Sequence, residues 1–379
     1  MRIDTDEFQK HCDAGYLKKQ TLDDLTIWNY THKAQYDRVW NDTTMLARGL
    51  ITTPGGTIHS RSFRKFFNLG ESPGPGIGEL PSESPVITTK MDGYLGLTYV
   101  HGGRVKIASR GSFTSEYAQW ATKWLQEVSP NAYDELNWAS YTFVFEILYP
   151  YRRIVVDNSN NFGLCLLAII HTDSGDELHR EFVVHTAKLH GWPVVKYWDT
   201  HSLVACIDSA KTLNGTEQEG FVAHYPKTGI RVKIKGEDYC RIHRIATRLT
   251  KRRIWEMLSP EMPSTGGTQI HEIMEILPPE YSNWIKSEAA ELLTQKNELY
   301  KRALLAVDRV WPKLARPAPG TRKYIVMALQ DNFKDVWHEA LYLIDGKEHL
   351  AIESIWNRIR PDHAIPVLAG GNLADGDDE

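Results

Sequence analysis

The hydrophobic pattern changes its period near Tyr239, and this change constrains the fold more than any other feature of the chain. Before it, β-branched and aromatic residues gather in short runs that are typical of strands, such as Leu25–Tyr30 and Thr142–Leu148. After it, apolar residues recur at helical spacing over long segments such as 282–311. The sequence therefore predicts an α+β protein, with an antiparallel-sheet N-terminal domain followed by an all-α C-terminal domain.

The predicted boundaries follow from this change and from the breaks between runs. We expect the first domain to cover residues 1–243 and the helical domain to cover 244–369, with a disordered acidic tail at 370–379. Within them we expect a helix over 5–19, with Thr5 or Asp6 as its N-cap. The further elements that bear on the structure below are strands over 45–51 and 153–156 and single helices over 245–258 and 321–343.

Composition excludes several classes of protein. The chain has 379 residues and a net charge of −4, which argues against a uniformly basic nucleic-acid coat but not against a local basic groove. The four cysteines (Cys12, Cys165, Cys206, Cys240) form no C-x-x-C pair, so we infer a reducing compartment. No signal core or membrane-length apolar run is present, and we expect a cytoplasmic protein. Neither a Walker lysine motif nor H-E-x-x-H occurs.

A lysine stands where one predicted strand gives way to a turn, in the stretch Lys90-Met91-Asp92-Gly93. Runs typical of strands flank it at 86–89 and 94–100. Glycine tolerates a positive φ, so the Asp-Gly turn can fix the backbone while the lysine projects from a rigid support. Such a lysine becomes a nucleophile if its neighbours lower its pKa from about 10.4. Taken alone, the stretch favours an ordinary hairpin lysine on the surface.

Two carboxylates also interrupt apolar strands. Glu146 lies within the run Thr142–Leu148, on the same face as Val144, and Glu219 opens the run 219–225. A buried carboxylate is costly unless it meets a cation or a metal. Glu146 is therefore either a satisfied structural residue or a functional one, and its own pattern does not decide between them.

Cations cluster in three further places. In the predicted strand 230–235, Val232 and Ile234 point to one side, and the cations Arg231, Lys233 and Lys235 point to the other. This pattern fits either a solvated edge strand or a phosphate site. Arg64 and Lys65 precede two phenylalanines. The segment is either a loop held in place by the buried rings, or a loop whose cations contact a phosphate or nucleotide. The first predicted helix of the C-terminal domain is basic. Its polar face is either simply solvated or binds along a phosphate backbone. Its cations are Arg241, His243, Arg244, Arg248, Lys251, Arg252 and Arg253.

Taken together, these polar exceptions suggest one site. Two carboxylates and three lysines that arise separately from half-buried strands of one domain suggest convergence on a polyanionic ligand and a metal. Lysines neutralise phosphates as point charges, and carboxylates hold Mg²⁺ through its waters. A lysine that attacks a nucleotide α-phosphate would use these groups, since a metal and neighbouring cations would depress its pKa and stabilise the developing charge.

The ordered set resembles the motifs of the covalent nucleotidyltransferases, which include the ATP-dependent ligases and capping guanylyltransferases. The matching segments are Lys90-Met91-Asp92-Gly93, Phe145-Glu146, Glu219-Gly220-Phe221-Val222 and Val232-Lys233-Ile234-Lys235. Four more features resemble the bacteriophage tRNA-repair type of RNA ligase. These are Ala47-Arg48-Gly49-Leu50-Ile51, Lys65-Phe66-Phe67-Asn68, Ser109-Arg110-Gly111-Ser112 and Tyr239. The resemblance covers about residues 24–243.

The resemblance implies an ATP-grasp-like nucleotidyltransferase (adenylyltransferase) domain and a role for each matched residue. Lys90 would become the lysyl-AMP, with loss of pyrophosphate, and Asp92 and Gly93 would shape the ribose side of the pocket. Glu146 and Glu219 would bind the ribose or hold water on Mg²⁺ or Mn²⁺. The remaining cofactor-binding positions would be Lys233 and Lys235 at the α-phosphate, Arg48 and Lys65 at the leaving pyrophosphate, and Arg110 and Tyr239.

The resemblance is incomplete at Arg110, where relatives often have lysine, because the two cations differ in geometry. It also implies that AMP passes to an RNA 5′-phosphate and is displaced by a 3′-hydroxyl. The expected partner is RNA with such ends, including nicked tRNA, and no membrane partner is expected. The protein would act as a monomer, in the host cytoplasm if the chain is phage-encoded. A DNA ligase, a capping enzyme and a non-catalytic tRNA-binding module are the alternatives, and the absence of a β domain after the K-x-K segment disfavours the first two.

Overall fold

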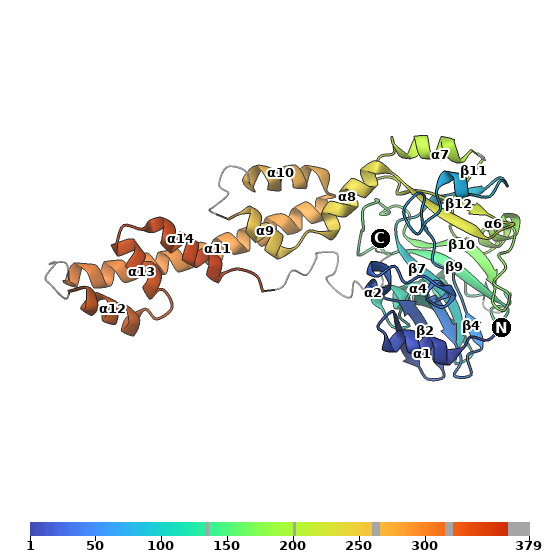
Figure 1. The fold of residues 1–379 in the computed structure, drawn as a ribbon, viewed down its shortest axis with the longest axis horizontal. Coiled ribbons are helices and arrows are strands. Elements are labelled where there is room, and N and C mark those ends of the chain that lie inside the picture. The colour runs from blue at the N-terminus through green and yellow to red at the C-terminus, as the bar shows by residue number, and fades with distance from the viewer. Residues whose placement is uncertain (133–135, 200–201, 260–265, 315–320, 363–379) are drawn as a thin grey trace. The chain divides into compact units, whose positions relative to one another are not determined.

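The computed structural model describes residues 1–132, 136–199, 202–259, 266–314 and 321–362. The predicted acidic tail at 370–379 lies outside these residues. The chain divides into two compact units, one within Met1–His243 and one within Arg244–Gly371. The first mixes helices with three sheets, and the described part of the second contains only helices (Figure 1). None of the helices in the described ranges is long and apolar enough to cross a membrane.

Almost all strand pairs in the first unit are antiparallel, and the sheets run in the orders β1-β2-β3-β4, β10-β9-β7-β8 and β11-β6-β12-β13-β5. One parallel pair joins β13 to β5. The strands are β1 (Leu17–Leu22), β2 (Leu25–Tyr30), β3 (Arg48–Thr52), β4 (Ile58–Ser60), β5 (Phe67–Asn68), β6 (Val86–Lys90), β7 (Tyr94–His101), β8 (Arg104–Ser109), β9 (Tyr141–Leu148), β10 (Gly163–His171), β11 (Tyr197–Trp198), β12 (Gly220–Tyr225) and β13 (Ile230–Lys235).

Helices cover the outer faces of two of these sheets. Phe143, Phe145 and Ile147 of β9 point toward α4 and α6, and Phe221 and Ile234 pack with α7. This leaves the other face of each sheet for the site. The helices of the first unit are α1 (Thr5–Asp13), α2 (His32–Tyr36), α3 (Asp42–Leu46), a 3₁₀ turn (Ile77–Glu79), α4 (Glu116–Val128), α6 (Arg180–Leu189), α7 (Leu203–Ala210) and α8 (Glu237–Thr247), the last of which continues into the second unit.

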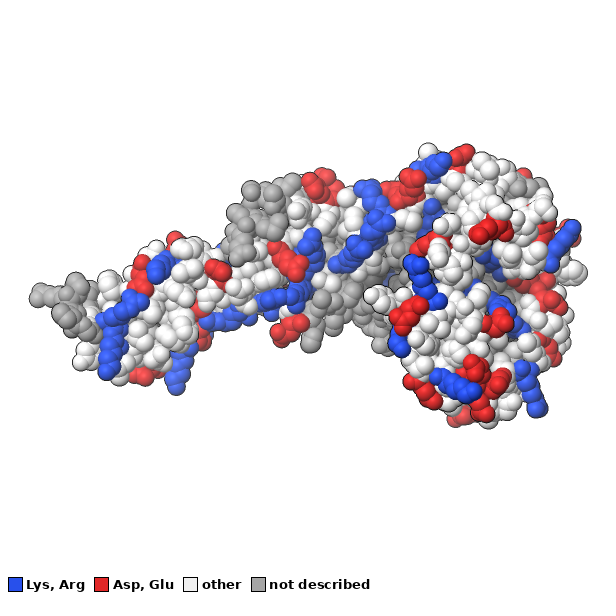
Figure 2. Space-filling view, in the orientation of Figure 1, with Lys and Arg blue, Asp and Glu red and all other residues white. Residues whose placement is uncertain are grey.

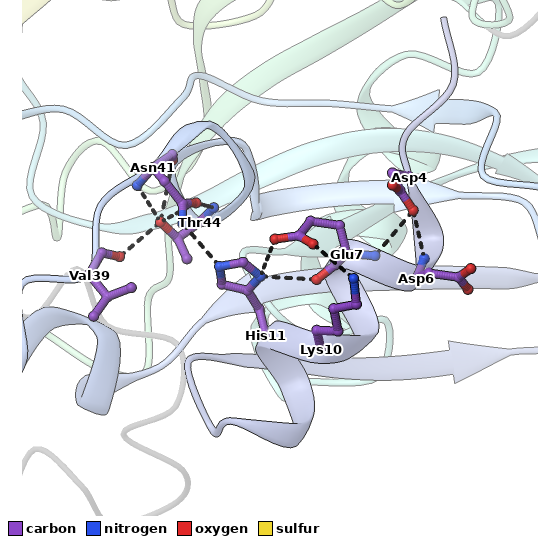
Figure 3. Close-up of polar contacts among 8 residues, drawn as sticks. All are labelled: Asp4, Asp6, Glu7, Lys10, His11, Val39, Asn41 and Thr44. Carbon is purple, nitrogen blue, oxygen red and sulfur yellow. Dashed lines mark hydrogen bonds and ion pairs between the residues drawn. The ribbon is translucent and has the colours of Figure 1, made fainter.

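A hydrogen-bond network joins α1 to the start of α3 (Figure 3). Asn41 Nδ2 donates to His11 Nε2 at 3.0 Å, and His11 Nδ1 donates to the Glu7 carbonyl at 2.9 Å. Asn41 also accepts from the Thr44 amide at 2.9 Å and so caps α3. Because β3 begins two residues after α3, this network fixes the backbone from which Arg48 projects.

The second unit is a helical assembly around α11. Ala303 and Ala306 of α11 pack against Ile325 and Leu329 of α12, and Trp255 stacks on Trp356 with 5.8 Å between ring centroids. Small residues on α11 let the neighbouring helices approach closely. The helices are α9 (Lys251–Met257), α10 (Gly266–Ile276), α11 (Pro279–Leu314), α12 (Thr321–Asn332), α13 (Trp337–Ile344) and α14 (Glu348–Arg358).

Two predicted N-terminal elements are wrong at their ends. The first helix stops at Asp13 because Gly15 adopts a φ of +79°, and residues 17–22 then form a strand. Its N-cap is Asp4 rather than Thr5 or Asp6, because the Asp4 carboxylate accepts from the amides of Asp6 and Glu7 at 3.0 and 3.1 Å. The predicted strand at 45–51 is partly helical, since α3 ends at Leu46.

Three later predictions are also wrong. Residues 153–156 form no strand, and the amides of Val155 and Val156 donate to the Asp92 carboxylate instead. The predicted helix at 245–258 is broken, since Thr250 caps a new helix by accepting from the Arg253 amide at 2.9 Å. The segment 321–343 contains two helices, α12 and α13, rather than one.

Gly220 is the residue at which β12 depends most on the absence of a side chain. Its φ is +150°, and a Cβ there would lie 2.1 Å from the Ile234 carbonyl oxygen. We expect Gly220→Ala to lower the free energy of unfolding by at least about 2 kcal/mol. Gly55→Ala is the matched control, since nothing lies within 4 Å of its Cβ position, and should stay within about 0.5 kcal/mol of wild type. Denaturant unfolding measures both, and equal stability of the two variants would contradict the predicted clash.

Candidate active site

Paired residues of β6, β12 and β13 form a ladder that faces one cleft. Antiparallel pairing places Lys90 opposite Gly220, and Gly220 opposite Lys235. Side chains two residues apart on a strand share a face, so the next pairs along the strands point the same way. We call these sets rungs: Lys90–Gly220–Lys235 is the first, Thr88–Val222–Lys233 the second and Val86–His224–Arg231 the third.

A carboxylate joins the two lysines of the first rung. Lys90 Nζ donates to Glu219 Oε2 at 2.8 Å, and Lys235 Nζ lies 3.5 Å from Glu219 Oε1. All three side chains are at most one-tenth exposed. Because buried charges are stable only when they are paired, Glu219 holds both ammonium groups at the end of the cleft.

The cleft has a volume of about 540 Å³, within the range of small-molecule sites. Lys90, Glu146, Arg48 and Lys233 line its polar end. Its walls are mainly apolar further along, and its distal end is charged again. The apolar lining includes Leu95, Leu167, Val195 and Val222.

Asp92 is buried and holds three segments together. Its Oδ2 accepts from the amides of Val155 and Val156 at 2.8 and 2.7 Å, and its Oδ1 accepts from the Tyr239 hydroxyl at 2.8 Å. Burial, with the nearby Glu219 charge, raises the pKa of Asp92, and the three hydrogen bonds oppose this rise. Tyr239 in turn lies under Lys235, 5.6 Å from ring centroid to Nζ. Asp92 therefore supports the first rung from behind.

Gly93 brings Glu146 to the site by close packing. The Gly93 amide donates to Glu146 Oε1 at 3.0 Å. A Cβ on Gly93 would lie 2.6 Å from the Ile147 carbonyl oxygen, so only glycine lets the turn before β7 approach β9 this closely. Its φ lies outside the left-handed region, which corrects the sequence-based reason for a glycine here.

A second cationic cluster lies outside the lining of the cleft. Lys65 is enclosed by the rings of Tyr30, Trp40 and Phe67, with ring centroids 4.9, 5.3 and 5.6 Å from Nζ. The Tyr30 hydroxyl accepts from Lys65 at 3.3 Å and from Arg110 at 3.0 Å. One hydroxyl therefore positions two buried cations, and the ring faces stabilise their charge.

The third rung closes the distal end of the cleft with an ion pair. Arg231 donates from Nη1 and Nη2 to the two oxygens of Glu177 at 2.8 and 2.7 Å, and His224 Nε2 lies 3.8 Å from Glu177. Burial would raise the pKa of Glu177, but Arg231 outweighs it and holds this pKa below its ordinary value. Burial and the Arg231 charge lower the pKa of His224 to about 4. At neutral pH this end therefore carries an ion pair beside an uncharged imidazole.

Residues 46–239 match the sequence model of a protein family described as RNA ligase. The chain belongs to this RNA ligase family. The matched range contains the whole ladder, the Glu219 carboxylate, the Glu177–Arg231 pair, and Lys65 and Arg110, but not Tyr30, which positions these two cations.

Other similarities cover a short stretch of the chain or are distant in sequence. RNA ligase 1 of bacteriophage TS2126 is 44% identical over 71 residues, which are 17% of this chain and 18% of that protein. The chain thus spans less than a fifth of that relative's length. Among solved structures, it is similar to a putative ATP-dependent DNA ligase from Aquifex aeolicus (15% identity, TM-score 0.48, 79% and 81% of the two chains). It is also similar to an archaeal ATP-dependent RNA ligase (14% identity, TM-score 0.47, 75% of each chain).

In this RNA ligase family member, most of the residues chosen from sequence come together. Lys90, Glu219 and Lys235 are in contact, and Lys233, Arg48 and Glu146 line the same cleft. The solvated-edge interpretation of β13 is wrong, because the strand is paired on both sides and Lys233 is buried. Lys65 and Arg110 form their own cluster around Tyr30 instead.

The basic stretch after Tyr239 carries much of its charge in local ion pairs. Figure 2 likewise shows acidic and basic side chains interspersed on the face drawn, rather than one continuous basic area. The structure therefore favours the interpretation of a solvated, charge-paired face for this stretch. The pairs are Arg241–Asp238 (2.8 Å), Lys251–Glu288 (2.9 Å), Lys251–Glu291 (2.8 Å), Arg252–Glu256 (3.6 Å) and Arg253–Glu256 (3.3 Å).

Sequence reasoning missed Tyr30 and the Glu177 end of the cleft. The sequence could have indicated Arg231, since it alternates with Lys233 and Lys235 on one face of β13. It could not have indicated Glu177, because this residue lies in the connection between β10 and α6, where no periodic pattern predicts the direction of a side chain. Tyr30 ends an apolar strand, and only the fold brings it to Lys65.

The lowered pKa of His224 predicts a pH dependence of stability. Between about pH 6.5 and 4 the unfolded chain binds a proton at this histidine and the folded chain does not, so stability falls as the pH falls through this window. The contribution is on the order of 3 kcal/mol. His224→Gln should remove it, as measured by denaturant unfolding at pH 7 and pH 4. His185→Gln, at an exposed position of α6, is the control and should keep the wild-type dependence. A wild-type dependence in His224→Gln would contradict a neutral, buried imidazole.

Proposed function

We propose that this protein is an ATP-dependent RNA ligase that acts through a lysyl-AMP intermediate on Lys90. The observation that carries the proposal is the first rung, where Lys90 stands against Glu219 at the end of a cleft of nucleotide size. Membership of the RNA ligase family supports the choice of RNA as substrate.

In the first step, Lys90 Nζ attacks the α-phosphorus of ATP. A nitrogen–phosphorus bond forms, the bond from the α-phosphorus to the bridging oxygen breaks, and pyrophosphate leaves. The amine must be unprotonated to attack, and Glu219, 2.8 Å from Nζ, is placed to accept its proton. Asp92 acts on this step as a positioning residue, since its own oxygens are occupied by backbone amides and Tyr239.

The surrounding cations are assigned by position. Lys233 and Lys235, on the second and first rungs, would neutralise the α-phosphate as charge develops. Arg48, at the polar end of the cleft, would meet the leaving phosphates. Lys65 and Arg110, held by Tyr30, would supply further positive charge to that leaving group.

The donor set fits a hydrated Mg²⁺ or Mn²⁺ rather than a protein-built metal cage. Within the described ranges, no group of three or more histidine, cysteine or acidic side chains could hold a metal ion. Glu219 is shared by two lysines, and Glu146 accepts from the Gly93 amide. Mg²⁺ commonly keeps several waters and binds through one or two carboxylates and substrate phosphates, which these two residues allow. When bound, the ion would neutralise phosphate charge.

The later steps use RNA ends. An RNA 5′-phosphate oxygen attacks the lysyl-AMP phosphorus and releases Lys90, and a 3′-hydroxyl then attacks the 5′-phosphate and displaces AMP. We assign ATP chemistry to an ATP-grasp-like nucleotidyltransferase domain over 1–243. We assign RNA selection to the helical domain over 244–369, with nicked tRNA as the candidate substrate and a monomer as the working form.

Lys90→Ala tests the proposal directly. Wild-type protein incubated with ATP labelled at the α-phosphate and Mg²⁺ should retain acid-labile label, whereas Lys90→Ala should retain none, because its nucleophile is gone. Lys188→Ala, at an exposed lysine of α6, is the matched control and should label as wild type does. Label on Lys90→Ala would contradict the assignment of the nucleophile.

Sealing then separates RNA ligase from the other nucleotidyltransferases. Wild-type protein should join RNA with 5′-phosphate and 3′-hydroxyl ends using ATP, and a nicked tRNA anticodon loop can be compared with a linear oligonucleotide. Sealing of DNA ends alone, or dependence on GTP in place of ATP, would overturn the proposal. RNA binding without any AMP transfer would indicate a non-catalytic module.

A further inference from the structure

The third rung and Glu177 make a charged end-wall of the cleft that the proposed chemistry does not use. Arg231, His224 and Glu177 all line the cleft, with side chains 12, 17 and 22% exposed, so each is mainly buried but reachable from inside it. Arg231 also lies over the Phe63 ring, 4.1 Å from its centroid. The guanidinium is thus fixed by an aromatic face as well as by the carboxylate.

The ladder sets how far this end-wall lies from Lys90. Val86 and His224 pair with each other and are four residues along their strands from Lys90 and Gly220. At about 3.3 Å per residue this is on the order of 13 Å, comparable to the span of a nucleotide from its α-phosphate to the far edge of its base.

The walls between the two ends suit a base rather than phosphates. Val222 on the second rung faces the cleft, and Leu167 and Val195 line it as well. Tyr197 pairs with Thr88 and adds an aromatic side chain to the same lining. A nucleotide with its α-phosphate at Lys90 and Lys233 would therefore place its base against Val222 and the outer edge of that base at the third rung.

We propose that Glu177 reads this outer edge, by accepting a hydrogen bond from the 6-amino group of adenine. Arg231 occupies one lone pair on each oxygen of Glu177 and fixes the direction of the carboxylate. An ionised carboxylate has about four acceptor sites, so the arrangement leaves capacity for an amino donor. The inference rests on the proposed function, because it requires a nucleotide whose phosphate meets Lys90.

The same geometry rejects a 6-keto base. Hypoxanthine and guanine present an oxygen at position 6, and two acceptors facing each other repel and leave both groups without a donor. Arg231 cannot turn to serve that oxygen without breaking its two bonds to Glu177 and its contact with Phe63. Glu177 is thus a specificity-determining residue, and Arg231 is the residue that positions it.

The test measures adenylylation of Lys90 in the full chain with three triphosphates that differ at position 6. ATP carries an amino group there, purine riboside triphosphate a hydrogen, and inosine triphosphate a keto oxygen. The wild-type kcat/KM should be roughly ten- to a hundredfold higher for ATP than for purine riboside triphosphate, and lower still for inosine triphosphate. Equal use of ATP and purine riboside triphosphate would overturn the inference.

Two variants separate base reading from a structural role of the ion pair. Glu177→Gln presents an amide that can also donate, so the preference for ATP over inosine triphosphate should fall about tenfold or more. Glu177→Asp keeps the charge but withdraws it by one methylene, and should lower the preference for ATP over purine riboside triphosphate. Glu181→Gln, at an exposed position of α6, is the matched control and should keep all wild-type ratios.

A merely structural ion pair would change the rate with all three nucleotides by the same factor. Unchanged ratios in both Glu177 variants would therefore overturn the inference even if their activity fell. Failure of the proposed function is distinguishable, because then no nucleotide would label Lys90 in the wild-type protein. Labelling by ATP with equal use of all three nucleotides would leave that function standing and remove only the role of Glu177.

Discussion

The ion pairs of Glu219 with Lys90 and Lys235 are the interaction on which the site depends. Two ammonium groups and a carboxylate are buried at one end of a cleft, and their pairing offsets the cost of burying these charges. Their meeting requires β6, β12 and β13 to pair in one register. A slip by one residue would turn every one of these side chains to the opposite, apolar face.

The sheet explains why motifs far apart in the sequence act together. Lys90 ends β6, Glu219 precedes β12 and Lys235 ends β13, so three strand ends meet at one edge. Behind them, Asp92 ties the turn after β6 to Tyr239 in the helix after β13. The buried hydrogen bonds of Asp92 thus hold the same register from outside the cleft, and glycines at 93 and 220 permit the close backbone contacts.

Sequence reasoning identified the residues whose direction a strand period determines. Lys233 and Lys235 alternate with Val232 and Ile234, so their common face followed from spacing alone, and the split between sheets and helices followed from the change of period. Sequence reasoning failed where the position of a side chain depends on the loops that connect strands and helices. Glu177 comes from the segment between β10 and α6, and the helix at α1 ended early because Gly15 takes a left-handed conformation.

Long-range packing accounts for the remaining surprises. Tyr30 and Lys65 are 35 positions apart, and nothing in their local sequences indicates that one hydroxyl would serve both Lys65 and Arg110. The glycine at 93 was expected from its turn, but its reason is the approach of β9, which no local pattern reveals. The direction of side chains along a strand was therefore predictable, whereas the distant partners that position them were not.

A crystal structure with a non-hydrolysable ATP analogue tests the central claim most directly, namely that the ladder is a nucleotide site with Lys90 at its phosphate end. The α-phosphate should lie beside Lys90 and Lys233, with the base against Val222 and its outer edge at Glu177. A nucleotide bound outside this cleft, or bound in reverse with its phosphates at Arg231, would contradict the claim.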